Sequence, residues 1–222
     1  MSQALLDFIE IGQPQADKCV IWLHGLGANG HDFEPIIPEL NLPDDHNIRF
    51  IFPHAPQIPV TVNAGVVMPA WYDVYSMSFV NHEDEEGIRR SALQITQLIE
   101  HETKRGIHTS KIILAGFSQG GALALHTALR HPEPLAGVLA LSTYLPLIKQ
   151  FNDERHQVNQ NISIMMCHGN FDPVVPFHLG KDSRYFLEQA GYSVDWHSYP
   201  MQHSLCEDQI NHISQWIQKV LL

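Results

Sequence analysis

Short continuous apolar runs alternate with segments of helical periodicity along most of this chain. The apolar runs, which we predict to be strands, are 19–23, 48–52, 111–116, 137–141, 162–167 and 193–199. Apolar residues recur at helical spacing from Ile88 to Ile99, so a helix that Gly106 closes is predicted there. Further helices are expected after residue 118, near 177–189 and over 207–222.

The form of these apolar runs indicates the fold class. Strands that are buried on both faces are apolar throughout, whereas half-buried strands alternate with polar residues. Interleaved with helices, such strands predict βαβ units: an α/β fold with a mostly parallel central sheet and helices on both faces. Residues 60–62 are expected to form half of a small hairpin, and 5–11 could add an antiparallel edge strand. Since no linker or repeat divides residues 1–222, a single domain is predicted.

A candidate nucleophile stands where the third apolar run ends. Residues 116–120 read Gly-Phe-Ser-Gln-Gly, a G-x-S-x-G motif between a predicted strand and a predicted helix. In this setting a sharp turn holds Ser118 in a strained conformation and exposes its hydroxyl, and Gly116 and Gly120 leave room for the turn. The alternative is that Ser118 only caps the following helix, a common role for serine.

A serine hydroxyl needs a base to remove its proton and a carboxylate to orient that base. In the α/β-hydrolase order Ser, Asp, His, the acid and base follow later strands. Asp172 comes shortly after the run 162–167, and His203 comes shortly after 193–199. We therefore predict that Ser118, Asp172 and His203 form a catalytic triad. A turn-forming Asp-Pro and a surface histidine are the alternatives.

Acyl transfer also requires hydrogen-bond donors for the oxyanion. One expected donor is the backbone N–H of Gln119, which follows the nucleophile. The other is the N–H of Leu26, because the sequence His-Gly-Leu-Gly at 24–27 follows the first apolar run and resembles the glycine-rich oxyanion motif of esterases. His24 itself is expected to brace this loop. No dinucleotide-binding or P-loop pattern is completed here.

Composition narrows the class of protein. The 222 residues include 13 basic and 24 acidic side chains, a formal net charge of −11, which argues against nucleic acid or anionic lipid as a partner. Three cysteines fit reduced thiols in a cytoplasmic protein. The N-terminus does not resemble a secretory signal, and no run reaches the ~18 apolar residues of a membrane span.

Several motifs together resemble the carboxylesterase / acyl-protein thioesterase family, also called phospholipase/carboxylesterase. They lie at 22–27, 52–56, 68–73, 116–121 and 168–172, and the resemblance covers roughly residues 16–220. It implies a cofactor-free serine hydrolase of the α/β-hydrolase fold that cleaves carboxylic esters or thioesters. It also implies the same triad and oxyanion residues as above. The family usually has glycine before the catalytic histidine, where this chain has Gln202. A positive φ at that position would cost about 1–2 kcal/mol.

Substrate specificity is expected to come from apolar surface without a separate cap domain, because only the short connection 143–161 is available for one. The predicted acyl wall is the excursion 60–75, with Met68 and Trp71 near the site rim, joined by Leu26, Leu145 and Val174. Short- to medium-chain acyl esters or thioesters are the expected substrates, including S-acylated proteins or lysophospholipids. The oligomeric state stays open, with a homodimer as one outcome.

Two functions of other classes compete with this prediction. A metal-binding protein is suggested by the 15 histidines, but no metal-ligand spacing supports it, and most of the remaining histidines are expected on the surface. A non-catalytic binding module on a hydrolase scaffold is the other, because a fold alone does not give a function. Among enzymes, peptidases, true lipases and dienelactone hydrolases fit the chain length or the serine less well.

Overall fold

A seven-stranded sheet forms the centre of the protein. A computed structural model describes residues 5–76 and 83–222, and in that part of the chain the strand order is β1-β3-β2-β6-β7-β8-β9. Six strands run parallel, and β1 pairs antiparallel with β3 at one edge. The strands are β1 (Phe8–Ile11), β2 (Lys18–Leu23), β3 (Ile48–Pro53), β6 (Ile112–Phe117), β7 (Gly137–Leu141), β8 (Ser163–Gly169) and β9 (Val194–Tyr199).

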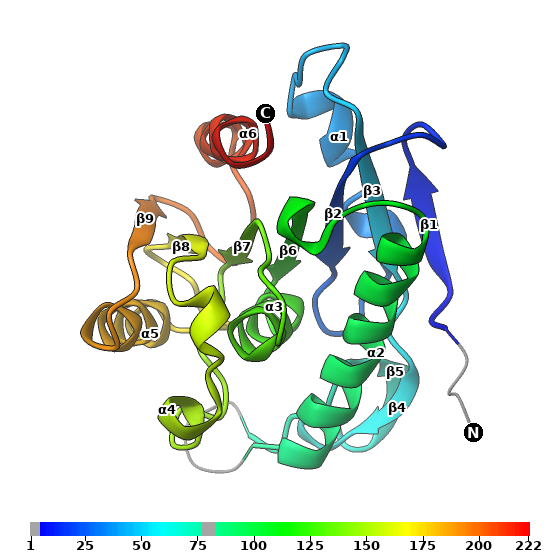
Figure 1. The fold of residues 1–222 in the computed structure, drawn as a ribbon. Helices are drawn as coiled ribbons and strands as arrows, with labels where there is room; N and C mark the ends of the chain where they lie inside the picture. The colour runs from blue at the N-terminus through cyan, green and yellow to red at the C-terminus, as the bar shows by residue number, and fades with distance from the viewer. Residues whose placement is uncertain (1–4, 77–82) are drawn as a thin grey trace.

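Helices cover both faces of this sheet (Figure 1). On one face, α1 (Ile36–Glu39) and α6 (Glu207–Leu221) enclose an apolar cluster that includes Phe50, Leu139 and Trp216. On the other face lie α2 (Glu85–Lys104), α3 (Gln119–Arg130) and α5 (Phe177–Gln189), and α4 (Phe151–Glu154) lies in the connection that follows β7. The predicted α/β fold, mostly parallel with helices on both faces, is confirmed.

Most predicted elements have the expected bounds to within two residues, because continuous apolar runs identify buried strands. The hairpin differs: its strands are β4 (Gln57–Val60) and β5 (Val66–Pro69), and Thr61–Asn63 form a 3₁₀ turn instead of continuing a strand. The edge strand β1 is shorter than predicted, and residues 1–4 of the N-terminal segment lie outside the described residues. Within the described residues no helix combines the length and apolar character needed to cross a membrane.

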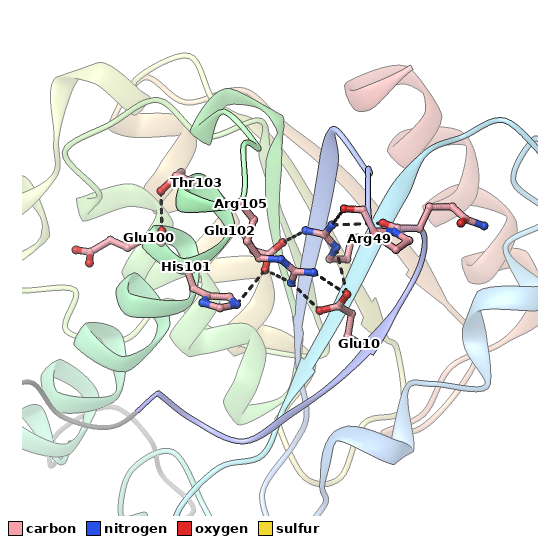
Figure 2. Close-up of polar contacts among 9 residues, drawn as sticks. Glu10, Arg49, Glu100, His101, Glu102, Thr103 and Arg105 are labelled. Carbon is pink, nitrogen blue, oxygen red and sulfur yellow. Dashed lines mark hydrogen bonds and ion pairs between the residues drawn. The ribbon is translucent and has the colours of Figure 1, made fainter.

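A network of charged side chains joins the edge strand to the end of α2 (Figure 2). The guanidinium of Arg49 on β3 is fully buried and donates to Glu102 Oε2 at 2.7 Å and to the Pro14 carbonyl at 2.6 Å. Arg105 donates to both carboxylate oxygens of Glu10, at 2.6 and 2.8 Å, and to Glu102 Oε1 at 2.9 Å. The charges of two arginines and two glutamates therefore compensate one another where β1 and β3 meet the end of α2.

Two histidines are exceptions to the prediction that most of the remaining histidines lie on the surface. His126 in α3 and His131 are buried, at 3% and 5% exposure. α3 packs against α2 and the sheet along nearly its whole length, which leaves no polar face to carry His126 outward. His82 lies outside the described residues.

His126 gives the protein a measurable acid sensitivity. Burial, with the nearby Arg130 and Arg89 charges, lowers the pKa of His126 from its ordinary value near 6.5 to about 3. Below about pH 6.5 the unfolded chain therefore binds a proton at His126 that the folded chain does not bind until the pH is near 3. The free energy of unfolding consequently falls as the pH drops. Between pH 7 and pH 5 we expect the unfolding free energy of wild type to fall by about 2 kcal/mol more than that of His126→Leu.

Urea denaturation of wild type and His126→Leu at both pH values measures this difference. His108→Leu is the matched control, because His108 is exposed and its substitution removes a histidine without removing a buried one. An equal pH dependence in wild type and His126→Leu contradicts the assignment.

Candidate active site

The carboxyl ends of the parallel strands bring distant parts of the chain together. Phe117 at the end of β6 pairs in register with Leu141 on β7, which pairs with Cys167 on β8. Gly169 at the end of β8 pairs with Tyr199 at the end of β9. The loops that follow these strands therefore meet at one edge of the sheet, where parallel α/β folds bind ligands.

Ser118 occupies a strained turn between β6 and α3. Its backbone has φ 55° and ψ −120°, a region that residues with a side chain rarely adopt. The turn is tight: a Cβ on Gly116 would lie 2.3 Å from the Gly120 backbone, and one on Gly120 would lie 2.4 Å from the Leu23 carbonyl oxygen. The Ser118 side chain makes no helix-capping hydrogen bond, which argues against the capping alternative.

Backbone contacts hold this turn in place. The Ser118 N–H donates to the Leu141 carbonyl at 2.8 Å, and Thr143 Oγ1 donates to the Ser118 carbonyl at 2.7 Å. Both partners come from the end of β7 or the segment that follows it, so the neighbouring strand fixes the strained conformation. Thr143 carried no signal in the sequence, because its role depends on the register between β6 and β7.

Asp172 and His203 are hydrogen-bonded to each other. His203 Nδ1 lies 2.7 Å from Asp172 Oδ2, and the amides of Val174 and Val175 donate to Asp172 Oδ1 at 2.8 and 2.9 Å. The carboxylate can only accept, so Nδ1 carries the proton and Nε2 is free to act as an acceptor. The His203 ring also packs against Phe117, with centroids 4.6 Å apart.

The environment of Asp172 keeps its carboxyl ionised. Its side chain is fully buried, and burial alone would raise the pKa. The hydrogen bond and charge of His203, with the two backbone amides, outweigh burial and hold the pKa of Asp172 below its usual range. An ionised Asp172 can therefore orient His203 and stabilise its protonated form.

Close packing positions the loop that carries His203. A Cβ on Gly169 would lie 2.3 Å from the Gln202 carbonyl oxygen and 2.6 Å from that of Met201, so only glycine fits there. Gln202 is exposed and is not among the residues with positive φ, so the strain considered for this position does not arise. The glycine turn after β8 is visible in the sequence, but this contact is not, because it depends on how β8 and β9 pair.

The loop after β2 is braced as predicted. His24 Nε2 accepts from the Ala55 N–H at 3.0 Å, so Nδ1 carries the proton and donates to the Gly25 carbonyl at 2.7 Å. Burial lowers the pKa of His24, which keeps the ring neutral. A Cβ on Gly25 would lie 3.5 Å from Ser118 Cβ, so the loop that carries Leu26 lies directly against the serine.

The Gln119 side chain ties the nucleophile turn to the segment after β5. Its Oε1 accepts from the Trp71 N–H at 2.9 Å, and its Nε2 donates to the Tyr72 carbonyl at 2.7 Å. Trp71 in turn donates its indole N–H to the His24 carbonyl at 2.9 Å. One connected set of hydrogen bonds therefore joins Gln119 to the loop that carries Leu26, and these are the two residues predicted to supply oxyanion donors.

Ser118 and His203 line the same cavity, which has a volume of about 590 Å³. Its walls are mainly apolar and include Leu26 and Val174, as the sequence predicted. They also include Phe33 and Ile36 at α1, which the sequence analysis did not single out. The hydrophobic pattern of the sequence does not mark α1 as part of the cavity wall, because a helix of only one turn is too short to show a periodic pattern.

The other residues predicted to contact substrate do not line this cavity. Trp71 has no exposed surface, so the expectation that it lies at the site rim is wrong: its indole is needed to bridge to His24. Leu145 is buried, and its N–H donates to Ser183 Oγ at 2.8 Å. Met68 is half-buried beside Gly27, with its sulfur 3.7 Å from a Cβ placed there.

A metal site would require several ligating side chains close together. In residues 5–76 and 83–222 no group of three or more His, Cys, Asp or Glu side chains is arranged to hold a metal ion. Cys19, Cys167 and Cys206 are all free thiols, as predicted from their number.

The sequence from residue 6 to residue 221 matches the model of the Phospholipase/Carboxylesterase family. The match extends over nearly the whole chain and includes Ser118, Asp172 and His203. The chain belongs to this family. It is 38% identical over 216 residues to acyl-protein thioesterase 1 of Gibberella zeae, covering 93% of this chain and 92% of that protein. The corresponding protein of Neurospora crassa is 37% identical over 211 residues, covering 91% and 86%.

Solved structures agree with the family assignment. SOBER1 of Arabidopsis thaliana superposes with a TM-score of 0.87 at 31% identity, over 92% of this chain and 99% of that one. Acyl-protein thioesterase 2 of Zea mays gives 0.87 at 29% identity, over 97% and 99%. The α/β-hydrolase fold and the assignment as a hydrolase are therefore confirmed, and an enzyme is favoured over a binding module.

Proposed function

We propose that the protein hydrolyses acyl esters and thioesters through an acyl-enzyme on Ser118, with His203 as general base and Asp172 as its orienting carboxylate. The observation that carries this proposal is the 2.7 Å contact between His203 Nδ1 and Asp172 Oδ2, made at the cavity that Ser118 also lines. This arrangement combines a strained serine at the cavity wall with a histidine whose Nε2 is free to accept a proton.

The reaction follows from the roles of these atoms. His203 Nε2 takes the Ser118 proton while Oγ bonds to the acyl carbon, and the backbone N–H groups of Leu26 and Gln119 bind the oxyanion. The C–S or C–O bond then breaks, and His203 returns the proton to the departing thiol or alcohol. Water, deprotonated by His203, attacks the acyl-enzyme in the same way and releases the acid and Ser118. Each oxyanion donor contributes ~10²–10³ in turnover.

The acyl half of the substrate is proposed to be short to medium in length. Val174 lines the cavity, and Met68 lies beside Gly27 in the loop that carries Leu26, so apolar side chains are available next to Ser118. The names of the relatives favour S-acylated protein as the natural substrate, with lysophospholipid as the alternative. The free thiols fit a cytoplasmic location.

A fluorophosphonate probe tests the proposal directly. We expect the probe to label the wild-type protein once, on the peptide that contains Ser118, because only an activated serine reacts with such probes. Ser142 is the internal control: it is buried and also has positive φ, but its hydroxyl has no hydrogen-bond partner among the described residues, so its peptide should stay unlabelled. No labelling of the folded protein, or labelling elsewhere, contradicts the proposal.

A panel of p-nitrophenyl esters and acyl thioesters of increasing chain length then separates the substrate classes. We expect hydrolysis to decline for long acyl chains. In Ser118→Ala, which lacks the serine that the probe labels, we expect it to be lost for all substrates. Activity that persists in that variant assigns the hydrolysis to another residue.

A further inference from the structure

The cavity at Ser118 is walled mainly by residues far from the predicted acyl wall. Phe33 and Ile36 contribute from the α1 side, and Leu205 and Ile210 contribute from the start of α6 and the loop before it. The β4–β5 hairpin contributes no residue to this lining. The site therefore has a second side, formed by the segments at α1 and at the start of α6, in addition to the hairpin side that the sequence suggested.

The reaction indicates which half of the substrate this second side receives. His203 must donate a proton to the departing thiol or alcohol, so the departing atom lies within hydrogen-bond reach of the imidazole. Ser204 and Leu205, which directly follow His203, line the cavity. The part of the substrate attached to the departing atom thus meets the wall formed by the loop after His203.

Charge distinguishes this wall from an ordinary apolar pocket. Asp32 and Glu39 line the cavity and are exposed, and none of the described lysines or arginines lines it. In the described part of the chain neither carboxylate forms an ion pair with a basic side chain. Two uncompensated negative charges therefore face whatever group occupies this side.

We propose that this cavity binds the thiol or alcohol half of the substrate, and that Asp32 and Glu39 select leaving groups with a positive charge against those with a negative charge. This inference rests on the proposed function and specifies its substrate. A cysteine thiol in a peptide with neighbouring lysine or arginine side chains fits both the apolar wall and the carboxylates.

Three thioesters that share one acyl group and differ in the departing thiol test this selectivity. The thiols are thiocholine, its uncharged isostere 3,3-dimethylbutane-1-thiol, and the anionic 4-mercaptobutanoate. We expect wild type to give a kcat/KM about tenfold higher for the cationic than for the anionic substrate at low salt. In the double variant Asp32→Asn/Glu39→Gln the ratio should fall to about twofold, as it should for wild type at high salt.

The double variant Asp44→Asn/Asp45→Asn is the matched control, because it also removes two negative charges, but from an exposed loop outside the cavity lining. It should keep the wild-type ratio. An unchanged ratio in Asp32→Asn/Glu39→Gln, or an equal fall in the control, overturns the selective role of the two carboxylates.

A further arm distinguishes the two halves of the substrate. Ile36→Trp, which narrows the cavity, should lower kcat/KM for the bulky departing thiols while leaving the preference among acyl chain lengths unchanged. A shift in acyl chain-length preference instead assigns the cavity to the acyl half and overturns the proposal. Wild-type protein that neither labels nor hydrolyses any of the three thioesters contradicts the proposed function itself, whereas labelled, active protein with no charge preference refutes only this inference.

Discussion

Replacing Ser118 with alanine should lower kcat/KM for esters and thioesters by at least about 10⁴-fold. The remaining rate would come from the oxyanion donors and substrate binding, because the alanine variant has no nucleophile to form the acyl-enzyme. Ser118→Gly should be equally inactive. Initial rates with one thioester and one p-nitrophenyl ester measure the loss, and circular dichroism checks that both variants fold.

The two variants should differ in stability even though both are inactive. Alanine keeps a side chain at φ 55° and ψ −120°, whereas glycine adopts this conformation without strain. Ser118→Gly should therefore be more stable than Ser118→Ala by about 1–2 kcal/mol in urea denaturation. Ser142→Ala, at the end of β7, should retain activity as the serine control. Equal stability of the glycine and alanine variants would argue against a strained turn.

Removing one member of the buried charge network should cause the largest loss of stability. Glu102→Leu leaves the fully buried Arg49 without its closest carboxylate, so we expect the unfolding free energy to fall by about 3–5 kcal/mol. The double variant Arg49→Met/Glu102→Leu removes both charges and should recover most of this loss. Urea denaturation of the two variants and of Arg49→Met completes the double-mutant cycle.

An exposed ion pair provides the comparison. Arg184 and Glu188 are 2.8 Å apart on the surface of α5, and Glu188→Gln should cost less than about 1 kcal/mol because water screens both charges. If Glu102→Leu were no more harmful than Glu188→Gln, or if the double variant were as unstable as the worse single variant, the network would not act as a compensated unit.

Local patterns in the sequence were sufficient for the sheet and for the candidate triad. Continuous apolar runs identify strands that are buried on both faces, and Ser118, Asp172 and His203 each follow such a run closely. Because the carboxyl ends of parallel strands lie at the same edge of a sheet, residues that follow three such strands are expected to lie near one another. The structure brings Asp172 into contact with His203 and places Ser118 on the same cavity.

Contacts between distant segments explain what the sequence did not reveal. Trp71 was expected at the site rim, but it is fully buried, and its indole N–H donates to the carbonyl of His24, 47 residues away. Gly169 has no unusual φ, and its importance comes from the Gln202 carbonyl that packs against it. His126 is polar, yet it is buried because both neighbouring layers cover α3. Each of these roles depends on tertiary packing that no local pattern encodes.

The two outer strands of the sheet bear on how the protein resists aggregation. β1 has four residues, and β9 carries the carboxylate of Asp195, hydrogen-bonded to His197 at 2.9 Å, on its partly exposed surface. Unpaired backbone groups on an outer strand invite pairing with another chain, and short length and charged side chains discourage it. Two copies of this protein would therefore associate through helices or loops in preference to extending one sheet into the next.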